Sequence, residues 1–344
     1  MAGKAQTIRS ATLQGFPAVA AELGLNAAQM MRRAGLPARC LDDLSTQVSV
    51  DGVRKLLELT AEASGVDDVG LRLARNRRLS NLGPVALALR QEPTGLQALE
   101  TLCRYFHIVN VALLIKIEQV NDLIYIREEL MLAHAAPARQ ALEMSVGMMF
   151  QTLREVLGAQ WRARMVCFTH RPPSDMRAHR ALFGAQVEFN AAFNGIICNL
   201  RDLKQELPRT DPDMARYARD YLERAIGPVR HTNVEVVRQL VSVLMPSGRC
   251  TVDQVAQHLE VDRRTVHRWL EAEEETFSSI LRQVRREFVQ RRLAESDSPI
   301  AEVGKFLGFS SSSAFAHWFR TEFDSTAAAW RRAQGPARRA AKTS

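Results

Sequence analysis

Apolar residues recur every three or four positions in several long stretches of the first two-thirds of the chain, which is the spacing of an amphipathic helix. This pattern predicts helices over residues 53–63, 96–105 and 137–157. Shorter stretches rich in β-branched and aromatic residues predict strands at 112–117, 123–127, 164–169, 186–189 and 195–199. Only a few residues separate the first two strands, which favours an antiparallel hairpin. We therefore expect an α+β fold here.

The pattern changes after about residue 230, where one amphipathic helix follows another. Gly227-Pro228 lies between the two patterns, and glycine and proline are the strongest local breakers of regular structure. We predict an α+β regulatory domain over 1–226, a linker over 227–232 and an all-α domain over 233–333. A basic tail, which we expect to be disordered, follows over 334–344.

An apolar stripe ends the first domain, in a predicted helix over 211–226 that includes Met214, Tyr217 and Tyr221. Such a stripe has to pack against another apolar surface. One interpretation is that it belongs to the core of its own domain. The alternative is that Met214, Tyr217 and Tyr221 form the seam of a homodimer.

The second domain contains a first helix-turn-helix pattern. Thr251 and Gln254 have the spacing of a capping box, which begins one helix, and Asp262 can cap a second helix over 263–270. We expect Val266, Trp269 and Leu270 to point inward. Guanidinium and imidazole groups on the outer face can reach base edges or phosphates of DNA. The residues on that face are Arg263, Arg264, His267 and Arg268.

A second helix-turn-helix pattern follows, with Ser298 as the predicted N-cap and Pro299 at the first helical position. Gly308 ends that helix, and the next one begins within 310–313. We expect Phe315 and Phe319 to face the core. The residues then left for a DNA groove are Ser311, Ser312, Ala316 and His317.

The two second helices begin 49 residues apart, and a predicted helix over 277–293 connects the two units. This connector is about 25 Å long at about 1.5 Å per residue. One turn of B-DNA advances about 34 Å, so the connector can hold two recognition helices in successive major grooves. We predict phosphate contacts by Arg282 and Arg285 of the connector and by Arg320. The alternative is that the connector arginines lie on an ordinary solvated helix face.

Residues 307–310 read Leu-Gly-Phe-Ser, and aromatic residues follow at Phe315, Phe319, Phe323 and Trp330. With Val255-Ala256, Arg268-Trp269-Leu270 and Ile300-Ala301, this spacing resembles the AraC/XylS family of bacterial transcription regulators from about residue 234 to 332. The resemblance implies a double helix-turn-helix domain that binds a promoter operator in double-stranded DNA, with RNA polymerase as a further partner.

This chain departs from the family pattern in three places. Glu275 stands where the turn after the first recognition helix usually has glycine, and the closing Phe-Gly-x-Ser-Pro reads Phe-Asp-Ser-Thr-Ala over 323–327. His317 stands where arginine is common. The first two departures bear on turn geometry, and the third implies weaker or pH-sensitive DNA contact by the second unit.

The first domain resembles, between about residues 20 and 210, the arabinose-binding-like effector and dimerisation domain of regulators of the ornithine-utilisation type. The supporting segments are Ala34-Gly35-Leu36-Pro37, His170-Arg171-Pro172 and Val187-Glu188-Phe189. This resemblance implies a sensor of a small molecule that it does not identify. Polar residues within apolar sequence are candidates for the effector pocket, although satisfied buried polar groups are the commoner explanation for such residues. They are Tyr105, His107, Asn110 and His134.

Composition agrees with this interpretation without requiring it. The 344 residues include 46 Lys and Arg against 38 Asp and Glu, a net charge of +8 that suits a polyanionic partner. We expect a cytoplasmic protein without a membrane segment, because no apolar run approaches about 20 residues. The five cysteines contain no Cys-x-x-Cys pair, and no His-Glu-x-x-His or phosphate-binding glycine loop occurs, so we predict no catalytic residue, metal or cofactor.

Two classes of function remain. The favoured one is a DNA-binding transcription regulator, an activator that responds to a small molecule and acts as a homodimer. The alternative is an enzyme or metabolite-binding protein that acts through residues 1–226, with the helical part as a scaffold.

Overall fold

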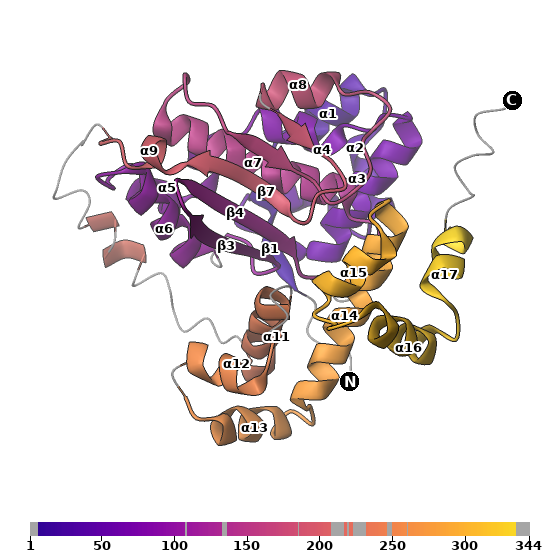
Figure 1. Cartoon of the computed structure of the whole chain (residues 1–344). Coiled ribbons are helices and arrows are strands. Elements are labelled where there is room, and N and C mark those ends of the chain that lie inside the picture. The colour runs from indigo at the N-terminus through magenta and orange to yellow at the C-terminus, as the bar shows by residue number, and fades with distance from the viewer. Residues whose placement is uncertain are drawn as a thin grey trace, which may run out of the picture. The chain divides into compact units, whose positions relative to one another are not determined.

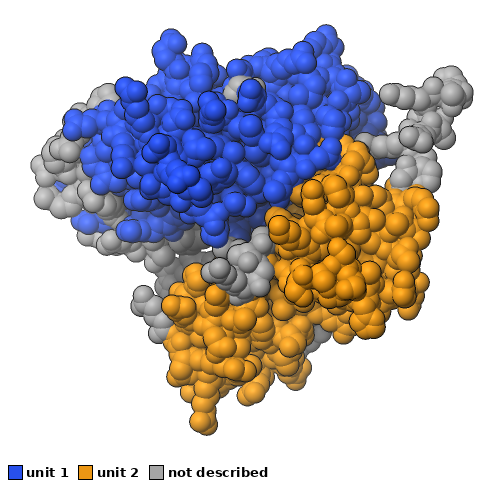
Figure 2. All heavy atoms as spheres, in the orientation of Figure 1, with its two compact units in different colours: residues 1–133, 138–168, 172–228 blue, residues 134–137, 169–171, 229–344 orange. Residues whose placement is uncertain are grey.

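The computed structural model describes residues 6–106, 109–132, 136–184, 186–207, 217–218, 220–222, 232–245, 250–259 and 261–334. The chain divides into two compact units (Figure 2). Unit 1 holds residues 1–133, 138–168 and 172–228, and unit 2 holds 134–137, 169–171 and 229–344. Among the described residues, no helix is long and apolar enough to cross a membrane.

Unit 1 is built on a five-stranded sheet in the order β3-β4-β7-β5-β6 (Figure 1). Its strands are β3 (Leu113–Val120), β4 (Leu123–Leu130), β5 (Met165–Cys167), β6 (Val187–Glu188) and β7 (Asn194–Asn199). All neighbours are antiparallel except β5 and β6. Val120 pairs with Leu123, which confirms the predicted hairpin, and Asn121 in its two-residue turn has a left-handed φ of 54°.

Helices cover this sheet and form a second apolar core beside it. They are α1 (Phe16–Glu22), α2 (Ala27–Arg33), α3 (Val50–Ser64), α4 (Val69–Arg75), α5 (Pro84–Leu89), α6 (Gly95–Tyr105), α7 (Arg139–Leu157), α8 (Arg177–Phe183) and α9 (Leu200–Leu203). A small sheet of β1 (Thr7–Arg9) and β2 (Gln47–Ser49) was not predicted. The arrangement confirms the expected α+β class.

Helix α7 is central, because it packs on β4 and β7 and also contacts α3 and α4. Its close approach to α4 depends on Gly70, where an added Cβ would lie 2.1 Å from the carbonyl oxygen of Gln140. The side chain of Gln140 also accepts the backbone N–H of Gly70 at 2.9 Å. A side chain at position 70 would therefore push the two helices apart.

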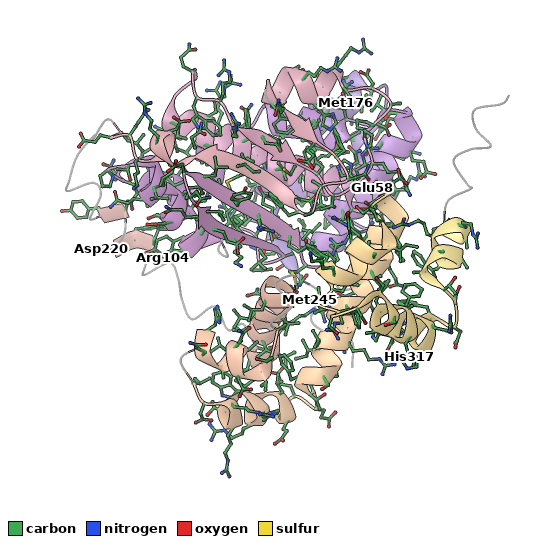
Figure 3. The ribbon with its side chains drawn as sticks, in the orientation of Figure 1. Glu58, Arg104, Met176, Asp220, Met245 and His317 are labelled. Carbon is green, nitrogen blue, oxygen red and sulfur yellow. The ribbon has the colours of Figure 1, made fainter. Side chains whose placement is uncertain are left out.

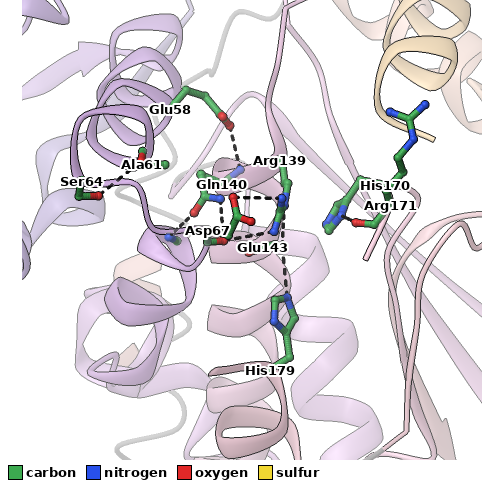
Figure 4. Close-up of polar contacts among 11 residues, drawn as sticks. Glu58, Ala61, Ser64, Asp67, Arg139, Gln140, Glu143, His170, Arg171 and His179 are labelled. Carbon is green, nitrogen blue, oxygen red and sulfur yellow. Dashed lines mark hydrogen bonds and ion pairs between the residues drawn. The ribbon is translucent and has the colours of Figure 1, made fainter. Parts of the chain in front are cut away.

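A buried polar network fixes the first turn of α7 (Figure 4). Glu143 is fully buried and accepts hydrogen bonds from Arg139 at 3.1 Å and pairs with Nε2 of His179 at 3.2 Å. Glu58 of α3 accepts the backbone N–H of Gln140 at 2.8 Å, and burial raises the pKa of the Glu58 carboxyl. These contacts orient α7 within unit 1.

Unit 2 is all-helical, as predicted, with α14 running between two groups of shorter helices (Figure 1). Its helices are α11 (Asn233–Leu244), α12 (Val252–His258), α13 (Arg263–Glu271), α14 (Phe277–Glu295), α15 (Ile300–Phe306), α16 (Ser312–Phe323) and α17 (Ala327–Gln334). Val241, Val266, Leu293 and Phe319 are fully buried in its apolar cluster. Arg171, which clusters with this unit, donates to the carbonyl oxygen of Ala294 at 2.8 Å.

Candidate nucleic-acid interface and ligand pocket

The first helix-turn-helix unit consists of α12 and α13. Thr251 caps α12 by accepting the N–H of Gln254 at 3.2 Å, although the described contacts include no return bond from the Gln254 side chain. Asp262 caps α13 by accepting the N–H of Thr265 at 2.6 Å. That backbone hydrogen bond lowers the pKa of the Asp262 carboxyl, so the cap is ionised at neutral pH. Both helix starts were predicted.

The outer face of α13 is cationic. Arg263, Arg264 and Arg268 are exposed and His267 is half-buried. Val266 and Leu270 are fully buried beneath them, as predicted. Arg263 lies 3.8 Å from Asp253 of α12, whereas no hydrogen bond or ion pair within 4.0 Å is described for the side chains of Arg264 and Arg268. The charge of Arg268 acts on the Asp262 carboxyl and helps to lower its pKa. The face can therefore offer two guanidinium groups to base edges or phosphates.

The prediction that Trp269 points into the core is wrong. We expected it to point inward, but it is only half-buried and lies outside the apolar cluster of unit 2. Val266 and Leu270 are one turn apart and define the buried stripe, which leaves position 269 at its edge. The tryptophans that pack against this cluster are Trp318, whose ring lies 5.2 Å from that of Phe309, and Trp330, whose ring lies 6.3 Å from that of Phe323.

The second unit consists of α15 and α16. The first helix begins at Ile300 with Pro299 at the N-cap, so Ser298 is not the cap that we predicted. Ser298 is buried, and its Oγ lies 2.7 Å from that of Ser296. Gly308 has the left-handed φ of 77° expected after the helix end, and Ser311 caps α16. Phe315 and Phe319 are buried, as predicted.

The outer face of α16 is small and nearly uncharged. It exposes the four predicted residues, Ser311, Ser312, Ala316 and His317 (His317 is labelled in Figure 3), and Arg320 is exposed one turn further on. Cations are thus concentrated on α13 and on Arg320. This difference implies that the two units make unequal contributions to binding a polyanion.

Most arginines of the connector α14 serve packing within unit 2. The guanidinium carbon of Arg285 lies 4.5 Å from the ring centre of Phe309, and its Nε donates to the carbonyl oxygen of Leu307 at 3.1 Å. The guanidinium of Arg286 lies 4.9 Å from the ring of Phe323. Arg292 is only 7 % exposed. Stacking of guanidinium on aromatic rings therefore joins the connector to the second helix-turn-helix unit.

Glu322 of α16 completes this junction. Its side chain is 6 % exposed and pairs with Arg282 at 2.6 Å and with Arg286 at 2.8 Å. Burial by itself would raise the pKa of Glu322, but the hydrogen bonds from the two arginines outweigh it and the pKa lies below its ordinary value. Arg282 remains 62 % exposed, so it keeps surface that a phosphate can reach.

Two of the three departures from the family pattern fall at or beside a residue with left-handed backbone. Asp324, which follows the last residue of α16, has φ 49°, and Glu274 in the turn after α13 has φ 58°. The residue with left-handed backbone in this turn is thus Glu274. We had expected Glu275, the next residue, to occupy the position where the family usually has glycine. A residue with a Cβ pays about 1–2 kcal/mol for this conformation, and glycine does not.

Unit 1 contains a cavity of about 90 Å³, which we call the α7 pocket. Met144, Met148 and Met149 of α7 line it together with Leu102, Phe106 and Leu113. Its polar lining includes Asn110, Glu128, Ser145 and Arg77. An apolar wall with a few polar groups is the usual construction of a small-molecule site.

The predicted effector and dimer residues lie in different environments in the structure. Asn110 lines the α7 pocket, while Tyr105 is buried in the adjoining core and does not line it. His107, His134 and Met214 lie outside the described residues. Tyr217 and Tyr221 are 62 % and 57 % exposed, whereas Ala218 and Leu222 beside them are buried in the core of unit 1. The predicted single stripe is therefore two faces.

Glu128 and Arg77 were missed by the sequence reasoning. The signal for Glu128 was present, because Ile124, Ile126, Glu128 and Leu130 alternate along β4 and all four are buried. A carboxyl in the apolar register of a strand indicates a special environment. Arg77 follows α4 in a polar segment, and its sequence context carries no comparable signal.

Both halves of the chain match families of known proteins. Residues 24–207 match the family described as the arabinose-binding domain of AraC transcription regulators, and residues 255–333 match a helix-turn-helix domain family. The HTH-type transcriptional regulator VirS of Mycobacterium tuberculosis is 29% identical over 321 residues, 93% of this chain and 94% of that one. The ornithine utilization regulator of Pseudomonas aeruginosa is 22% identical over 306 residues, 87% and 89% of the two chains.

Among solved structures, the transcriptional regulator CdpR from Pseudomonas aeruginosa matches with a TM-score of 0.39 at 20% identity, over 80% of this chain and 91% of that one. The first family match alone spans more than half of the 344 residues. With two helix-turn-helix units in unit 2 and an α+β unit before them, the protein belongs to the AraC family of DNA-binding transcription regulators.

Proposed function

We propose that the chain activates transcription by placing α13 and α16 in successive major grooves on one face of a promoter operator. The observation that carries this proposal is the connector. Helix α14 has 19 residues, or about 28 Å of rise, and its arginines hold the second unit through Phe309, Phe323 and Glu322. A rigid connector of this length suits the advance of about 34 Å per turn of B-DNA.

The two units have different tasks in this proposal. Arg264 and Arg268 read guanine edges from α13, and Arg263 and His267 complete that contact surface. On α16, Ser311, Ser312, Ala316 and His317 present a small face that fits closely against bases without strong attraction to phosphate. Arg320 and the exposed part of Arg282 hold the phosphate backbone, while Arg285 is occupied by Phe309 and contributes mainly to packing.

Regulation enters through unit 1. A small-molecule effector binds there and alters DNA affinity through its different affinities for two states of the regulator. Tyr217 and Tyr221, both more than half exposed, form the seam of a homodimer that brings two DNA-binding units to adjacent sites. The DNA-bound regulator then recruits RNA polymerase in the bacterial cytoplasm, and transcription in vitro from the bound promoter measures the sign of regulation.

A gel shift of the full chain on the DNA upstream of its own gene tests this function. Affinity should fall steeply with salt, by a slope of about 0.9 for each phosphate neutralised. Arg268→Ala should relax sequence preference, and Arg320→Ala should weaken binding to all sequences and reduce the salt slope by about 0.9.

Arg104→Ala is the matched control, because Arg104 is an exposed arginine of α6 in unit 1 (Figure 3) and its loss removes the same charge. Equal losses in all three variants would indicate a general charge effect. A chain that forms no salt-sensitive, sequence-preferring complex would favour the alternative, an enzyme or metabolite-binding protein acting through residues 1–226.

A further inference from the structure

Five charged side chains line the α7 pocket, four arginines and one glutamate, and two of them carry this inference. The first is Glu128 of β4, which is 2 % exposed. Its Oε2 accepts a hydrogen bond from the hydroxyl of Ser145, which also lines the pocket, and its Oε1 has no partner among the described residues. A buried acceptor without a donor is costly, so this oxygen is suited to a donor on a bound molecule.

The second group is the guanidinium of Arg77. Among the described residues it makes one hydrogen bond, to the carbonyl oxygen of Ala11 at 2.6 Å, and it has no acidic partner. Burial lowers its pKa to about 10. Arg54, another lining residue, differs because it pairs with Asp51 at 2.8 Å. Arg77 therefore keeps most of its five donors for an anion.

The two groups do not offset each other. Burial opposed by the Ser145 hydrogen bond sets the pKa of Glu128 at about 7, and burial alone lowers that of Arg77. No hydrogen bond or ion pair joins Glu128 and Arg77 among the described residues, so each can hold a different end of one bound molecule. The methionines of α7 with Leu102 and Phe106 provide the apolar part of the wall, and methionine adapts readily to an irregular apolar surface.

We propose that the effector is a small bifunctional organic acid, in which a short apolar body separates an acidic group that pairs with Arg77 from an amine or hydroxyl that donates to Glu128. This proposal rests on the proposed ligand-responsive regulation and names the chemical class of its ligand. A purely apolar ligand would leave both polar groups unsatisfied.

Calorimetric titration of the full chain with matched probes tests this assignment. The probes are 6-aminohexanoate, 6-hydroxyhexanoate, hexanoate and hexylamine, with four- and eight-carbon versions of each to cover other body lengths. The bifunctional acids should bind at least about tenfold more tightly than the simple acid of equal length, because the simple acid leaves Glu128 unpaired. The simple amine, which lacks the acidic group, should bind more weakly still.

Two variants assign the contacts. Arg77→Gln should weaken binding of every acid by about tenfold or more, and Glu128→Gln should weaken the amino acid by about tenfold while affecting the hydroxy acid less, because an amide oxygen still accepts from a hydroxyl. The matched controls are Arg75→Gln, an exposed arginine outside the pocket, and Glu129→Gln, on the opposite face of β4. Neither control should change affinity.

The outcomes separate this proposal from the proposed function. If hexanoate binds as tightly as its bifunctional relatives, or if no probe binds, the proposed ligand class is wrong. A DNA complex that still forms in the gel shift would show that the proposed function stands in that case. Loss of all DNA binding would instead overturn the proposed function, whatever the probes do. If circular dichroism shows that Arg77→Gln does not fold, the comparison of the probes on the unaltered chain still tests the proposal.

Discussion

Replacing Glu128 by glutamine is expected to remove a large pH dependence from the stability of unit 1. The carboxyl is 2 % exposed, and burial raises its pKa from 4.5 to about 7 even though Ser145 donates to it. One pKa unit corresponds to about 1.4 kcal/mol. The ionised carboxylate therefore costs the folded unit about 3 kcal/mol relative to the unfolded chain.

The pH range of this cost follows from the two pKa values. Below pH 4.5 the carboxyl is protonated in both states and contributes nothing. Between pH 4.5 and about 7 the unfolded chain releases the proton while the folded chain keeps it, so stability falls as pH rises. Above about pH 7 both states are ionised and the full cost is present. Glu128→Gln removes the charge, so the variant should exceed the wild type by about 3 kcal/mol at pH 8 and by little at pH 4.5.

Reactivity of Cys198 measures this effect in unit 1 alone. Cys198 is fully buried on β7 and pairs with Ile124 of the strand that carries Glu128. A thiol reagent modifies it only in unfolded molecules, so the urea midpoint at each pH reports the stability of this unit. The control is Glu62→Gln, which changes an exposed residue of α3 in unit 1 and should behave like the wild type. If the stability difference between Glu128→Gln and the wild type is the same at both pH values, the burial argument is wrong.

Three further perturbations test other parts of the account. Phe319→Ala should destabilise unit 2 by about 3–5 kcal/mol, because the ring is fully buried beside Phe323; a variant that keeps its melting curve but loses DNA would contradict this placement. Asp324→Gly should stabilise unit 2 by up to about 1 kcal/mol, since relief of left-handed strain exceeds the added backbone entropy of glycine. Its matched control is Glu273→Gly, which changes a residue whose φ is not positive and should therefore destabilise unit 2 in the same thermal melts. Tyr221→Glu should weaken self-association in sedimentation without changing unit 2, and an unchanged dimer would place the seam elsewhere.

Local patterns predicted the elements whose determinants are local. The hairpin of β3 and β4, the caps Thr251 and Asp262, and the stop at Gly308 follow from short-range chemistry, and the structure has them, whereas Pro299 replaces the predicted cap Ser298. The strands β1 and β2 were missed because each is short and its partner is distant in the sequence: Thr7 pairs with Ser49.

Features that depend on distant partners were not predictable in the same way. The arginines of α14 have the pattern of a solvated or DNA-facing surface, yet Arg285 and Arg286 stack on rings from α16 and the turn before it, which no spacing within α14 indicates. Glu128 and Arg77 likewise line one pocket although they are 51 positions apart in the sequence. Such sites are created by tertiary packing.

The most direct test of the central claim is a hydroxyl-radical footprint of the full chain on its operator. Two recognition helices on one rigid connector should protect two patches on the same face of the duplex, about 10 base pairs apart. The double variant Arg264→Ala, Arg268→Ala removes two exposed guanidinium groups of α13, so it should abolish one of the two protected patches of DNA and weaken protection of the other. A single patch in the wild type, or two patches on opposite faces of the duplex, would contradict the claim that α13 and α16 occupy successive major grooves.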